Sequence, residues 1–290
     1  MRRLTVASAQ TGPVFDENPE AALPAALGMI ADAAKRNVDI VCFSEVFLTP
    51  FFPNRLVEEF DGFFTPLDGP VVARAAEAAR DHGIAVILPV GEKAAAGYFN
   101  SAVVIDKNGR RAGVYRKTHI PAYFPTQAAG GTGSYEKFYF APGNSLSLFE
   151  LEGVRFGIQI CNDRLYPEPS RVLALGGAEI IFMPICYSTY DRSDYRANLW
   201  EIPLRARAFE NGVFVVAANR VGQEGPRHHL GRSMVVAPNG EIMTEAGTDK
   251  PELLVATIDL DAVTAARKKF PWWRDRRPDL YQPITAPYPA

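Results

Sequence analysis

Apolar and polar residues along the first ninety positions predict strands and helices in alternation. Three short apolar runs, at residues 4–9, 38–43 and 84–90, predict strands that are buried on both faces. Two alanine-rich segments between them, residues 18–35 and 69–81, carry apolar residues three and four positions apart, which is typical of helices that bury one face. This order of strands and helices indicates a sheet that is covered by helices.

A second pattern, the β-hairpin, appears from residue 98 onward. Three pairs of strand-like segments are joined by short turns that contain glycine, namely 98–106 with 110–117, 146–151 with 154–160, and 234–237 with 241–244. Helix-like segments at 170–175 and 195–211 and strand-like segments at 179–184 and 213–218 continue the earlier alternation. Because hairpins and crossovers occur together, we expect an α/β fold in which two mixed sheets stack and helices cover their outer faces.

The chain shows no sign of a domain boundary. No break in composition, internal repeat or low-complexity segment divides it, so residues 1–290 are predicted to form one domain. Residues 122–134, rich in glycine, alanine and threonine, predict a loop long enough to be functional. From about residue 270, five prolines and two tryptophans argue against a regular element. We expect this extended tail to lie along a surface and to pack across a subunit interface of a homo-oligomer, either a dimer or a tetramer.

Composition excludes several classes of function. Hydrophobic residues make up 47% of the chain, which allows a sizeable core. A formal net charge of -2 is too balanced for a protein that binds nucleic acid through its charge. Three widely spaced cysteines without a CxxC pair argue against a disulfide framework or a thiolate zinc site. Since neither a signal peptide nor ~18 uninterrupted apolar residues occur, we expect a soluble cytoplasmic protein with no membrane partner.

The sequence predicts neither a metal site nor a cofactor. His228 and His229 stand side by side in a polar segment, with no carboxylate or third histidine at ligand spacing, so we interpret the pair as a solvated turn. The glycine pairs of the chain lack the GxGxxG spacing, and no glycine-rich phosphate-binding loop is present.

Three reactive side chains stand where predicted strands end. Glu45 follows the run DIVCF, Lys117 ends GVYRK, and Cys161 follows FGIQI. A thiol of pKa ~8.5 needs a base or a nearby cation to react at neutral pH. Glu45 could be that base, and Lys117 could stabilise an oxyanion. Taken singly, Cys161 could be a core residue and the other two an ion pair at a sheet edge. His119 is the nearest histidine that could form a Cys–His pair.

The segments around these residues are similar to those of one family. FSEVFLTPFFP around Glu45, YRKTHIP around Lys117 and ICNDRLYPEPSR around Cys161 resemble the signature of the nitrilase superfamily of carbon–nitrogen hydrolases, in which a Glu, a Lys and a Cys each end a strand. The segments VASAQ, RARAFENGVFVVAANRVG and SMVVAPNGEI extend the resemblance over nearly the whole chain. It implies a four-layer α-β-β-α sandwich, which agrees with the pattern of crossovers and hairpins.

The resemblance also implies a role for each residue. Glu45 would be the general base that takes the thiol proton, and Cys161 would be the nucleophile that forms a thioester-type intermediate. Lys117 would help to bind the tetrahedral oxyanion, together with the backbone N–H of Asn162. Sites of this kind commonly contain a second glutamate after the lysine, and Glu136 in GSYEKFYFAPG occupies that place. A solvated hairpin charge is the alternative interpretation of Glu136.

Within the superfamily, TPFFP and ICNDR look most like the N-carbamoyl-amino-acid amidohydrolases, especially those that act on N-carbamoyl-D-amino acids. That group holds the substrate carboxylate with paired arginines after the cysteine. Here Arg164 is followed by Leu165, and Ser134-Tyr135 stands where a histidine precedes the second glutamate. An N-carbamoyl amino acid, a related ureido acid, N-carbamoylputrescine, an aliphatic amide and a nitrile are therefore all candidate substrates, and hydrolysis would release ammonia.

The predicted substrate-binding residues are Asn162, Arg164, His119, Phe51, Phe124 and Tyr187. The guanidinium of Arg164 could clamp a carboxylate with two hydrogen bonds, or it could form a salt bridge with Asp163, Glu168 or another local acid. The aromatic members could line a hydrophobic pocket or belong to the core. We expect an enzyme that acts on a small molecule. The alternative from another class is a catalytically silent or ammonia-donating interaction protein, against which the complete Glu–Lys–Cys set argues.

Overall fold

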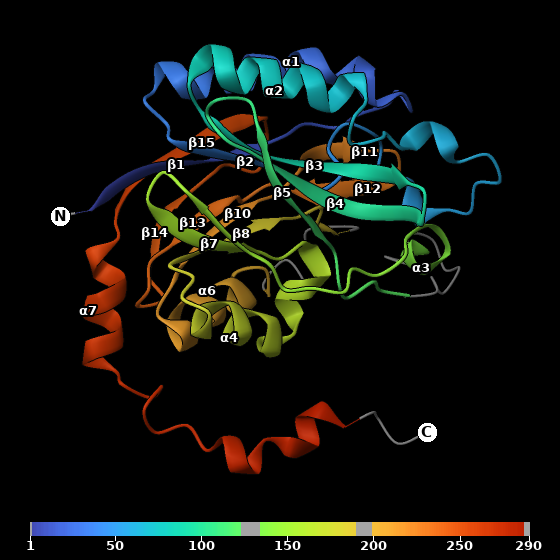
Figure 1. The fold of residues 1–290 in the computed structure, drawn as a ribbon. Coiled ribbons are helices and arrows are strands. Elements are labelled where there is room, and N and C mark those ends of the chain that lie inside the picture. The colour runs from blue at the N-terminus through green and yellow to red at the C-terminus, as the bar shows by residue number, and fades with distance from the viewer. Residues whose placement is uncertain (1, 123–133, 190–198, 287–290) are drawn as a thin grey trace.

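The protein forms four layers in the order helices, sheet, sheet, helices, as the computed structural model shows for residues 2–122, 134–189 and 199–286 (Figure 1). This arrangement confirms the predicted α-β-β-α sandwich of two mixed sheets. None of the helices in these three ranges has the length and apolar character that crossing a membrane requires.

The first sheet has the strand order β15-β1-β2-β3-β4-β5. Its strands are β1 (Arg3–Gln10), β2 (Ile40–Phe43), β3 (Ala85–Ala94), β4 (Gly97–Ile105), β5 (Arg111–Arg116) and β15 (Glu252–Asp259). β1, β2 and β3 run parallel, and the other three strands are added by antiparallel pairing. Helices α1 (Pro19–Lys35) and α2 (Pro70–His82) connect the parallel strands and cover the outer face.

The second sheet has the strand order β14-β13-β10-β8-β7-β6. Its strands are β6 (Leu148–Leu151), β7 (Val154–Ile158), β8 (Ile180–Pro184), β10 (Phe214–Ala218), β13 (Met234–Val236) and β14 (Ile242–Glu245). β7, β8 and β10 run parallel, as the continuous apolar runs predict. Helices α4 (Pro167–Leu175) and α6 (Glu201–Asn211) cover its outer face.

Three apolar clusters fill the spaces between the four layers. The inner cluster lies between the two sheets. It includes the fully buried side chains of Val6, Ile87, Phe156, Phe182 and Val216. The two outer clusters join each sheet to its helices. Burying one side chain of this size contributes about 1.5–3 kcal/mol, so the inner layer fixes how the two sheets face each other. The relative position of the strand ends is therefore rigid.

Several elements were not predicted. β15 and the following helix α7 (Asp261–Lys269) complete the first sheet and continue into the tail. A small third sheet contains β9 (Ser188–Thr189), β11 (Val221–Glu224) and β12 (Arg227–Leu230). The helix predicted for 195–211 starts at Glu201 in the described residues, and positions 195–198 lie outside them. The interpretation of His228 and His229 as a solvated turn is wrong, because both lie in β12 and His229 is fully buried.

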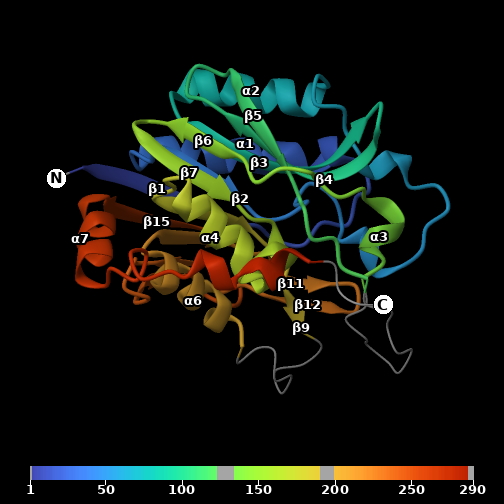
Figure 2. The same ribbon diagram turned by 60° about the horizontal axis from the view of Figure 1, so that its bottom comes forward.

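Short helical turns connect these elements. They are η1 (Phe52–Asn54), η2 (Asp61–Phe63), α3 (Glu136–Tyr139), η3 (Cys161–Leu165), η4 (Pro278–Leu280) and η5 (Gln282–Thr285). The last two belong to the tail, which runs along the outside of the α4 and α6 layer in both views (Figures 1 and 2). There the Trp272 ring packs edge-on against Phe209, with ring centroids 4.9 Å apart.

Candidate active site

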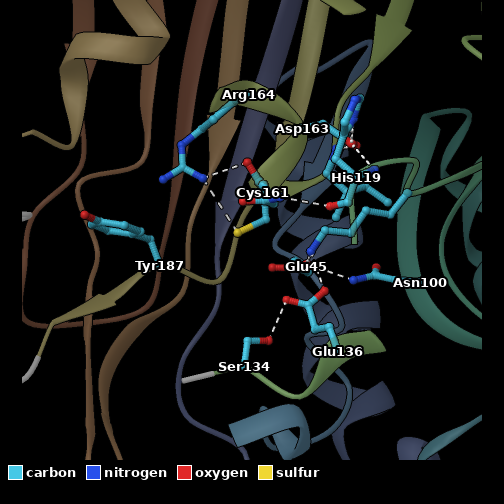
Figure 3. Close-up of polar contacts among 12 residues, drawn as sticks. Glu45, Asn100, His119, Ser134, Glu136, Cys161, Asp163, Arg164 and Tyr187 are labelled. Carbon is cyan, nitrogen blue, oxygen red and sulfur yellow. Dashed lines mark hydrogen bonds and ion pairs between the residues drawn. The ribbon is translucent and has the colours of Figure 1, made fainter. Parts of the chain in front are cut away.

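The ammonium group of Lys117 lies between the buried carboxylates of Glu45 and Glu136, the two glutamates labelled in Figure 3. Its Nζ donates to Glu45 Oε1 at 2.8 Å and to Glu136 Oε2 at 2.6 Å, and none of the three side chains is more than 4% exposed. Glu45 follows β2 and Lys117 follows β5, two strands that point to the same edge of the first sheet. Glu136 is the first residue of α3. The alternative of a solvated charge at Glu136 is therefore wrong.

Burial and the neighbouring charges together set the pKa values of Lys117 and Glu136. Burial alone would lower the pKa of Lys117, but the carboxylates of Glu136 and Glu45 hold it well above its ordinary value. Burial raises the pKa of Glu136, the ammonium of Lys117 opposes this, and the charge of Glu45 adds to it. The cluster thus combines a firmly protonated lysine with a carboxyl group of increased proton affinity. These are suitable properties for binding an oxyanion and for moving a proton.

Asn100 fixes one oxygen of the Glu45 carboxylate. Its Nδ2, from β4, donates at 2.8 Å to Oε1, the same oxygen that contacts Lys117. Glu45 Oε2 is buried and has no hydrogen-bond partner among the described residues. Since an unpaired buried carboxylate oxygen costs free energy, such atoms are concentrated where function requires them. Glu45 Oε2 is therefore the atom that can accept a proton in this site.

Cys161 occupies a strained turn. It begins η3 with φ of +45°, a left-handed conformation that costs a residue other than glycine about 1–3 kcal/mol. Figure 3 shows its sulfur facing the space above the Glu45 and Glu136 carboxylates. Burial, followed by the charge of Glu45, raises the pKa of the thiol to about 12, against the opposing effect of Lys117 and Arg164. Cys161 is thus a thiol at neutral pH, and a reaction through its sulfur would require a base to remove the proton.

One buried carboxylate, that of Asp163, joins the Cys161 turn to the chain beyond β5. Its Oδ2 accepts hydrogen bonds from the Ile160 N–H at 2.9 Å and from the Tyr115 hydroxyl at 2.7 Å. Its Oδ1 accepts the backbone N–H of His119 at 2.9 Å. Burial raises the pKa of Asp163, but hydrogen bonds from the side chains of His119 and Tyr115, the charge of Lys117 and the backbone N–H of His119 hold it below its ordinary value. Asp163 therefore holds two segments of the site at a fixed distance.

The His119 side chain takes part in the hydrogen bonds around Asp163. Its Nδ1 lies 2.8 Å from Asp163 Oδ1, and its ring stacks on Tyr166 with centroids 4.1 Å apart. Its carbonyl accepts a hydrogen bond from Asn162 Nδ2 at 3.0 Å. The imidazole is thus engaged with Asp163 and not with Cys161, and the structure shows no Cys–His pair here.

A buried ion pair holds the loop that follows Glu45. Val46 has φ of +37°, a strained conformation for a β-branched residue. Arg220 Nη2 donates to the Val46 carbonyl at 3.0 Å, while its Nη1 lies 2.5 Å from Glu224. Glu224 in turn accepts the Phe51 N–H at 2.6 Å. Arg220 and Glu224 therefore hold both the loop after Glu45 and Phe51, which lines the cavity described below.

Gly143 allows the chain to pass close behind Lys117. Its N–H donates to the Lys117 carbonyl at 2.8 Å. A Cβ at this position would lie 2.2 Å from the Arg116 carbonyl oxygen, so no other residue fits without moving the backbone next to Lys117.

A cavity of about 670 Å³ opens beside Cys161. Its described lining is Phe51, Pro121, Ser134, Glu136, Cys161, Asn162, Arg164, Leu165, Cys186, Tyr187, Ser188, Leu199, Ile202, Pro203, Ala206, Arg207 and Arg227. Of the predicted aromatic residues, Phe51 and Tyr187 line the cavity, Phe124 lies outside the described residues, and His119 is not part of this lining. No group of three His, Cys, Asp or Glu side chains in the described part of the chain could hold a metal ion.

Arg164 contacts Cys161 directly. Its Nη1 donates to the Cys161 carbonyl at 2.7 Å and lies 3.7 Å from the sulfur. The guanidinium lies over the Tyr187 ring at 5.0 Å, and its Nε is buried without a hydrogen-bond partner among the described residues. Arg164 therefore bonds to the backbone of the turn, and the predicted alternative, a salt bridge to Asp163 or Glu168, is not formed.

The fold and this site define a class of enzyme, which comparison with known proteins identifies. A family model described as carbon-nitrogen hydrolase matches residues 5–268. The chain belongs to this family, within the nitrilase superfamily, and is a hydrolase of carbon–nitrogen bonds other than peptide bonds.

Individual relatives differ in the substrate that their names give. The chain is 33% identical to an N-carbamoylputrescine amidase of Arabidopsis thaliana over 270 residues, 89% of this chain and 88% of that one. It is 30% identical to a citrullinase of Francisella tularensis over 292 residues, 94% and 96% of the two chains. A carbon-nitrogen hydrolase of Helicobacter pylori G27 superimposes with a TM-score of 0.90 at 29% identity, covering 99% and 100%.

Proposed function

We propose that this enzyme hydrolyses an N-carbamoyl amino acid, or a related ureido acid, through a covalent intermediate on Cys161. The observation that carries the proposal is the cluster itself, in which the Cys161 sulfur faces the carboxylates of Glu45 and Glu136, both bound to Lys117, beside an open cavity. The thiol is protonated at neutral pH, and Glu45 Oε2 is a buried acceptor without another partner. This pairing of a proton donor and an acceptor supports base-assisted attack.

The proposed reaction proceeds in two halves. Glu45 takes the thiol proton as the sulfur bonds to the carbonyl carbon, and the oxyanion is bound by the Lys117 ammonium and the backbone N–H of Asn162. The carbon–nitrogen bond then breaks as the leaving nitrogen takes the proton from Glu45, so ammonia leaves and a thioester-type intermediate stays on Cys161. Water attacks this intermediate, and Glu45 takes a proton from the water. The carbon–sulfur bond then breaks, Glu45 returns the proton to the sulfur, and the acyl group leaves as a carbamic acid, which loses CO2 to give the amino acid. Glu136 keeps Lys117 charged and in place throughout.

The cavity walls support a substrate that has an apolar part. Leu165, Ile202 and Pro203 form one apolar side, and the rings of Phe51 and Tyr187 add to it. An amino-acid side chain of moderate size could be buried there. Arg164 is proposed to bind at the reacting end of the substrate, because its guanidinium already contacts Cys161.

Plain amides, nitriles and N-carbamoylputrescine are the alternative substrates within the superfamily. The relatives from plants are named for N-carbamoylputrescine, and one relative from Pyrococcus abyssi, 31% identical over 284 residues, is named nitrilase. The Cys161 sulfur could attack the carbonyl or nitrile carbon of any of these compounds. The choice between the substrates must therefore come from the residues that line the cavity.

The test is ammonia release from a panel of N-carbamoyl-D- and L-amino acids, N-carbamoyl-β-alanine, N-carbamoylputrescine, plain amides and nitriles. We expect the highest kcat/KM for an N-carbamoyl amino acid and complete loss of turnover in Cys161→Ala. Cys42→Ala is the matched control, because Cys42 is a buried thiol of the inner core, away from the cavity lining. Activity retained in Cys161→Ala would overturn the mechanism, and activity confined to amides or nitriles would overturn the substrate class.

We further propose that residues 1–290 form one catalytic domain that acts in the cytoplasm as a homo-oligomer. All three cysteines are free thiols, and a cysteine nucleophile functions only while reduced. Most of the exposed large apolar side chains lie on η3, α4, α6 and the tail, namely Leu165, Tyr166, Val172, Leu175, Leu199, Ile202, Phe209, Phe270, Trp272, Leu280, Tyr281 and Ile284. A concentration of this kind on one face is typical of a protein interface, and we propose that a second copy of the chain covers it.

A further inference from the structure

Arg164 places a positive charge next to the sulfur of Cys161. Its Nη1 lies 3.7 Å from the sulfur and also donates to the Cys161 carbonyl at 2.7 Å. The side chain lines the cavity and is only 3% exposed. Within residues 2–122, 134–189 and 199–286, no carboxylate forms an ion pair with this guanidinium. The contact with Cys161 is therefore made by a cation whose charge is not compensated in this part of the chain.

Neighbouring side chains hold the Arg164 guanidinium in place. It lies over the Tyr187 ring at 5.0 Å and over the ring of the fully buried Trp200 at 5.5 Å. Arg207 donates to the carbonyls of Arg164 and Leu165 at 3.1 Å each, which fixes the backbone that carries the guanidinium. A donor that is fixed before the reaction stabilises a developing charge without the cost of reorganisation.

The same contacts argue against the carboxylate clamp that the sequence suggests as one role of Arg164. A guanidinium clamps a carboxylate with both terminal nitrogens, or with Nε and one terminal nitrogen. Nη1 already donates to the Cys161 backbone, and Nε is buried without a hydrogen-bond partner among the described residues. A carboxylate in the cavity could reach Nε only if the protein moved. The guanidinium is therefore better placed for the Cys161 sulfur than for a carboxylate.

Lys117 and Arg164 both act on the charge of the Cys161 sulfur, but their partners differ. Burial and then the charge of Glu45 raise the pKa of the thiol, Glu136 adds to this, and Lys117 and Arg164 lower it. Lys117 is bound by the carboxylates of Glu45 and Glu136. When the thiol proton passes to Glu45, negative charge moves from that carboxylate to the sulfur. Arg164 already contacts the sulfur, and a charged donor binds a thiolate more strongly than a thiol.

We infer that Arg164 is a catalytic residue that stabilises the negative charge on the Cys161 sulfur while Glu45 removes the thiol proton. The proton moves to Glu45 Oε2, the electron pair of the S–H bond stays on the sulfur, and the N–H of Arg164 Nη1 donates to it. This role rests on the proposed function and adds a residue to its first step. Loss of Arg164 should therefore slow the attack on every substrate, whatever charge the substrate carries.

Alkylation of Cys161 by iodoacetamide tests this role without any substrate. Mass spectrometry of the peptide that contains Cys161 reports its rate separately from those of Cys42 and Cys186. In Arg164→Gln and Arg164→Met we expect the rate at neutral pH to fall about tenfold or more and alkylation to begin at a higher pH, since one pKa unit changes the thiolate fraction tenfold. Arg164→Lys, which keeps a positive charge, should recover part of the rate. Arg74→Gln, an exposed position on α2, is the surface control.

Two variants without the charge are used so that one folded protein, identified by circular dichroism, is enough for the test. A wild-type rate of alkylation in a folded Arg164→Gln or Arg164→Met protein would overturn the inference. Rates that fall equally in Arg164→Lys and Arg164→Gln, with no change in their dependence on pH, would assign Arg164 a structural role and would also overturn it.

Turnover separates this role from carboxylate binding and from the proposed function. In Arg164→Gln we expect kcat to fall about 10- to 100-fold for each of N-carbamoyl-β-alanine, N-carbamoylputrescine and a neutral amide that the wild type hydrolyses, with KM changed less than about threefold. A rise in KM confined to the anionic substrate would show that Arg164 binds a carboxylate and would overturn the inference. Wild-type alkylation in the Arg164 variants, with Cys161→Ala inactive, would overturn the inference alone. Turnover retained in Cys161→Ala would overturn the proposed function.

Discussion

Asp163 accepts a hydrogen bond from the Tyr115 hydroxyl at 2.7 Å, and this contact joins the strand that leads to Lys117 to the turn that carries Cys161. Tyr115 lies in β5 of the first sheet and Asp163 in η3, which follows the second sheet, so one buried carboxylate links the segments that carry Lys117 and Cys161. Tyr115 is fully buried, and burial together with the charge of Asp163 holds its pKa well above the ordinary value, so the phenol stays a donor.

Replacing Asp163 tests this positioning. Asp163→Asn keeps the volume but removes the charge, and its amide cannot accept all of the hydrogen bonds that the carboxylate accepts. We expect the free energy of unfolding to fall by about 2–4 kcal/mol and kcat to fall more than tenfold with KM nearly unchanged. Thermal denaturation and steady-state kinetics check the two effects, with the exposed Asp249→Asn as the control. A loss of stability with unaltered kcat would show that Asp163 supports the fold but not the reaction.

Glu45→Gln tests the general base. With the amide the thiol proton has no acceptor, so kcat/KM should fall by about 10²- to 10⁴-fold at neutral pH. The pKa of Cys161 should move in the opposite sense, because the charge of Glu45 is one of the causes that raise it to about 12. Alkylation of the thiol by iodoacetamide should therefore begin at a lower pH in Glu45→Gln than in the wild type. A variant that is both less active and slower to alkylate at every pH would contradict the assignment.

The sequence predicts that Glu45, Lys117 and Cys161 act together because each of them ends an apolar run, and the resemblance adds Glu136. The structure brings Lys117 into contact with both glutamates, and their catalytic roles remain predictions. The residues that support them could not be found by the same signal. Asn100 stands inside the strand β4, and Asp163 follows the cysteine without a pattern of its own, so only their three-dimensional contacts show their roles.

The third sheet was missed for a related reason. β11 and β12 contain only two buried apolar residues, Val221 and Leu230, and their buried polar members include Glu224, which lies beside Arg220 and His229. Propensity and periodicity describe strands that bury hydrophobic faces, and this hairpin buries charges. β15 and α7 have ordinary patterns but follow the last hairpin, where no further element was expected.

Glu136→Gln tests the electrostatic role of the second glutamate. The carboxylate of Glu136 is the largest of the charges that raise the pKa of Lys117, while burial lowers it. Removing that charge must lower the pKa of Lys117, so the ammonium is lost at a lower pH. We expect the alkaline limb of the kcat profile to move toward neutral pH, in addition to a lower maximum. The exposed Glu150→Gln should leave the profile unchanged, and an unmoved alkaline limb in Glu136→Gln would exclude this role.

His229 is expected to limit stability in mild acid. Burial lowers its pKa to about 4, with Arg220 and Arg227 acting in the same direction and Glu224 opposing them. Below the unfolded pKa of ~6.5 the unfolded chain binds a proton that the folded protein does not, so the free energy of unfolding falls as pH drops from 6.5 toward 4. The slope contributed by this residue is at most about 1.4 kcal/mol per pH unit. His229→Gln should remove it and the half-buried His228→Gln should not, as denaturant titrations at pH 7 and pH 5 would show.

The exposed apolar residues of α4, α6 and the tail are proposed to contact a second copy of the chain. A single charge placed among them should weaken that contact. Val172 on α4 is 50% exposed, and a glutamate there would place a charge in the proposed contact without disturbing the core. We expect Val172→Glu to lower the molar mass measured by light scattering, while Leu56→Glu, equally exposed on another segment, leaves it unchanged. Deletion of the residues after Lys269 should have the same effect as Val172→Glu, since Trp272 covers part of this face by packing on Phe209. An unchanged mass in both variants, with circular dichroism confirming that they are folded, would show that this face does not bind a second copy.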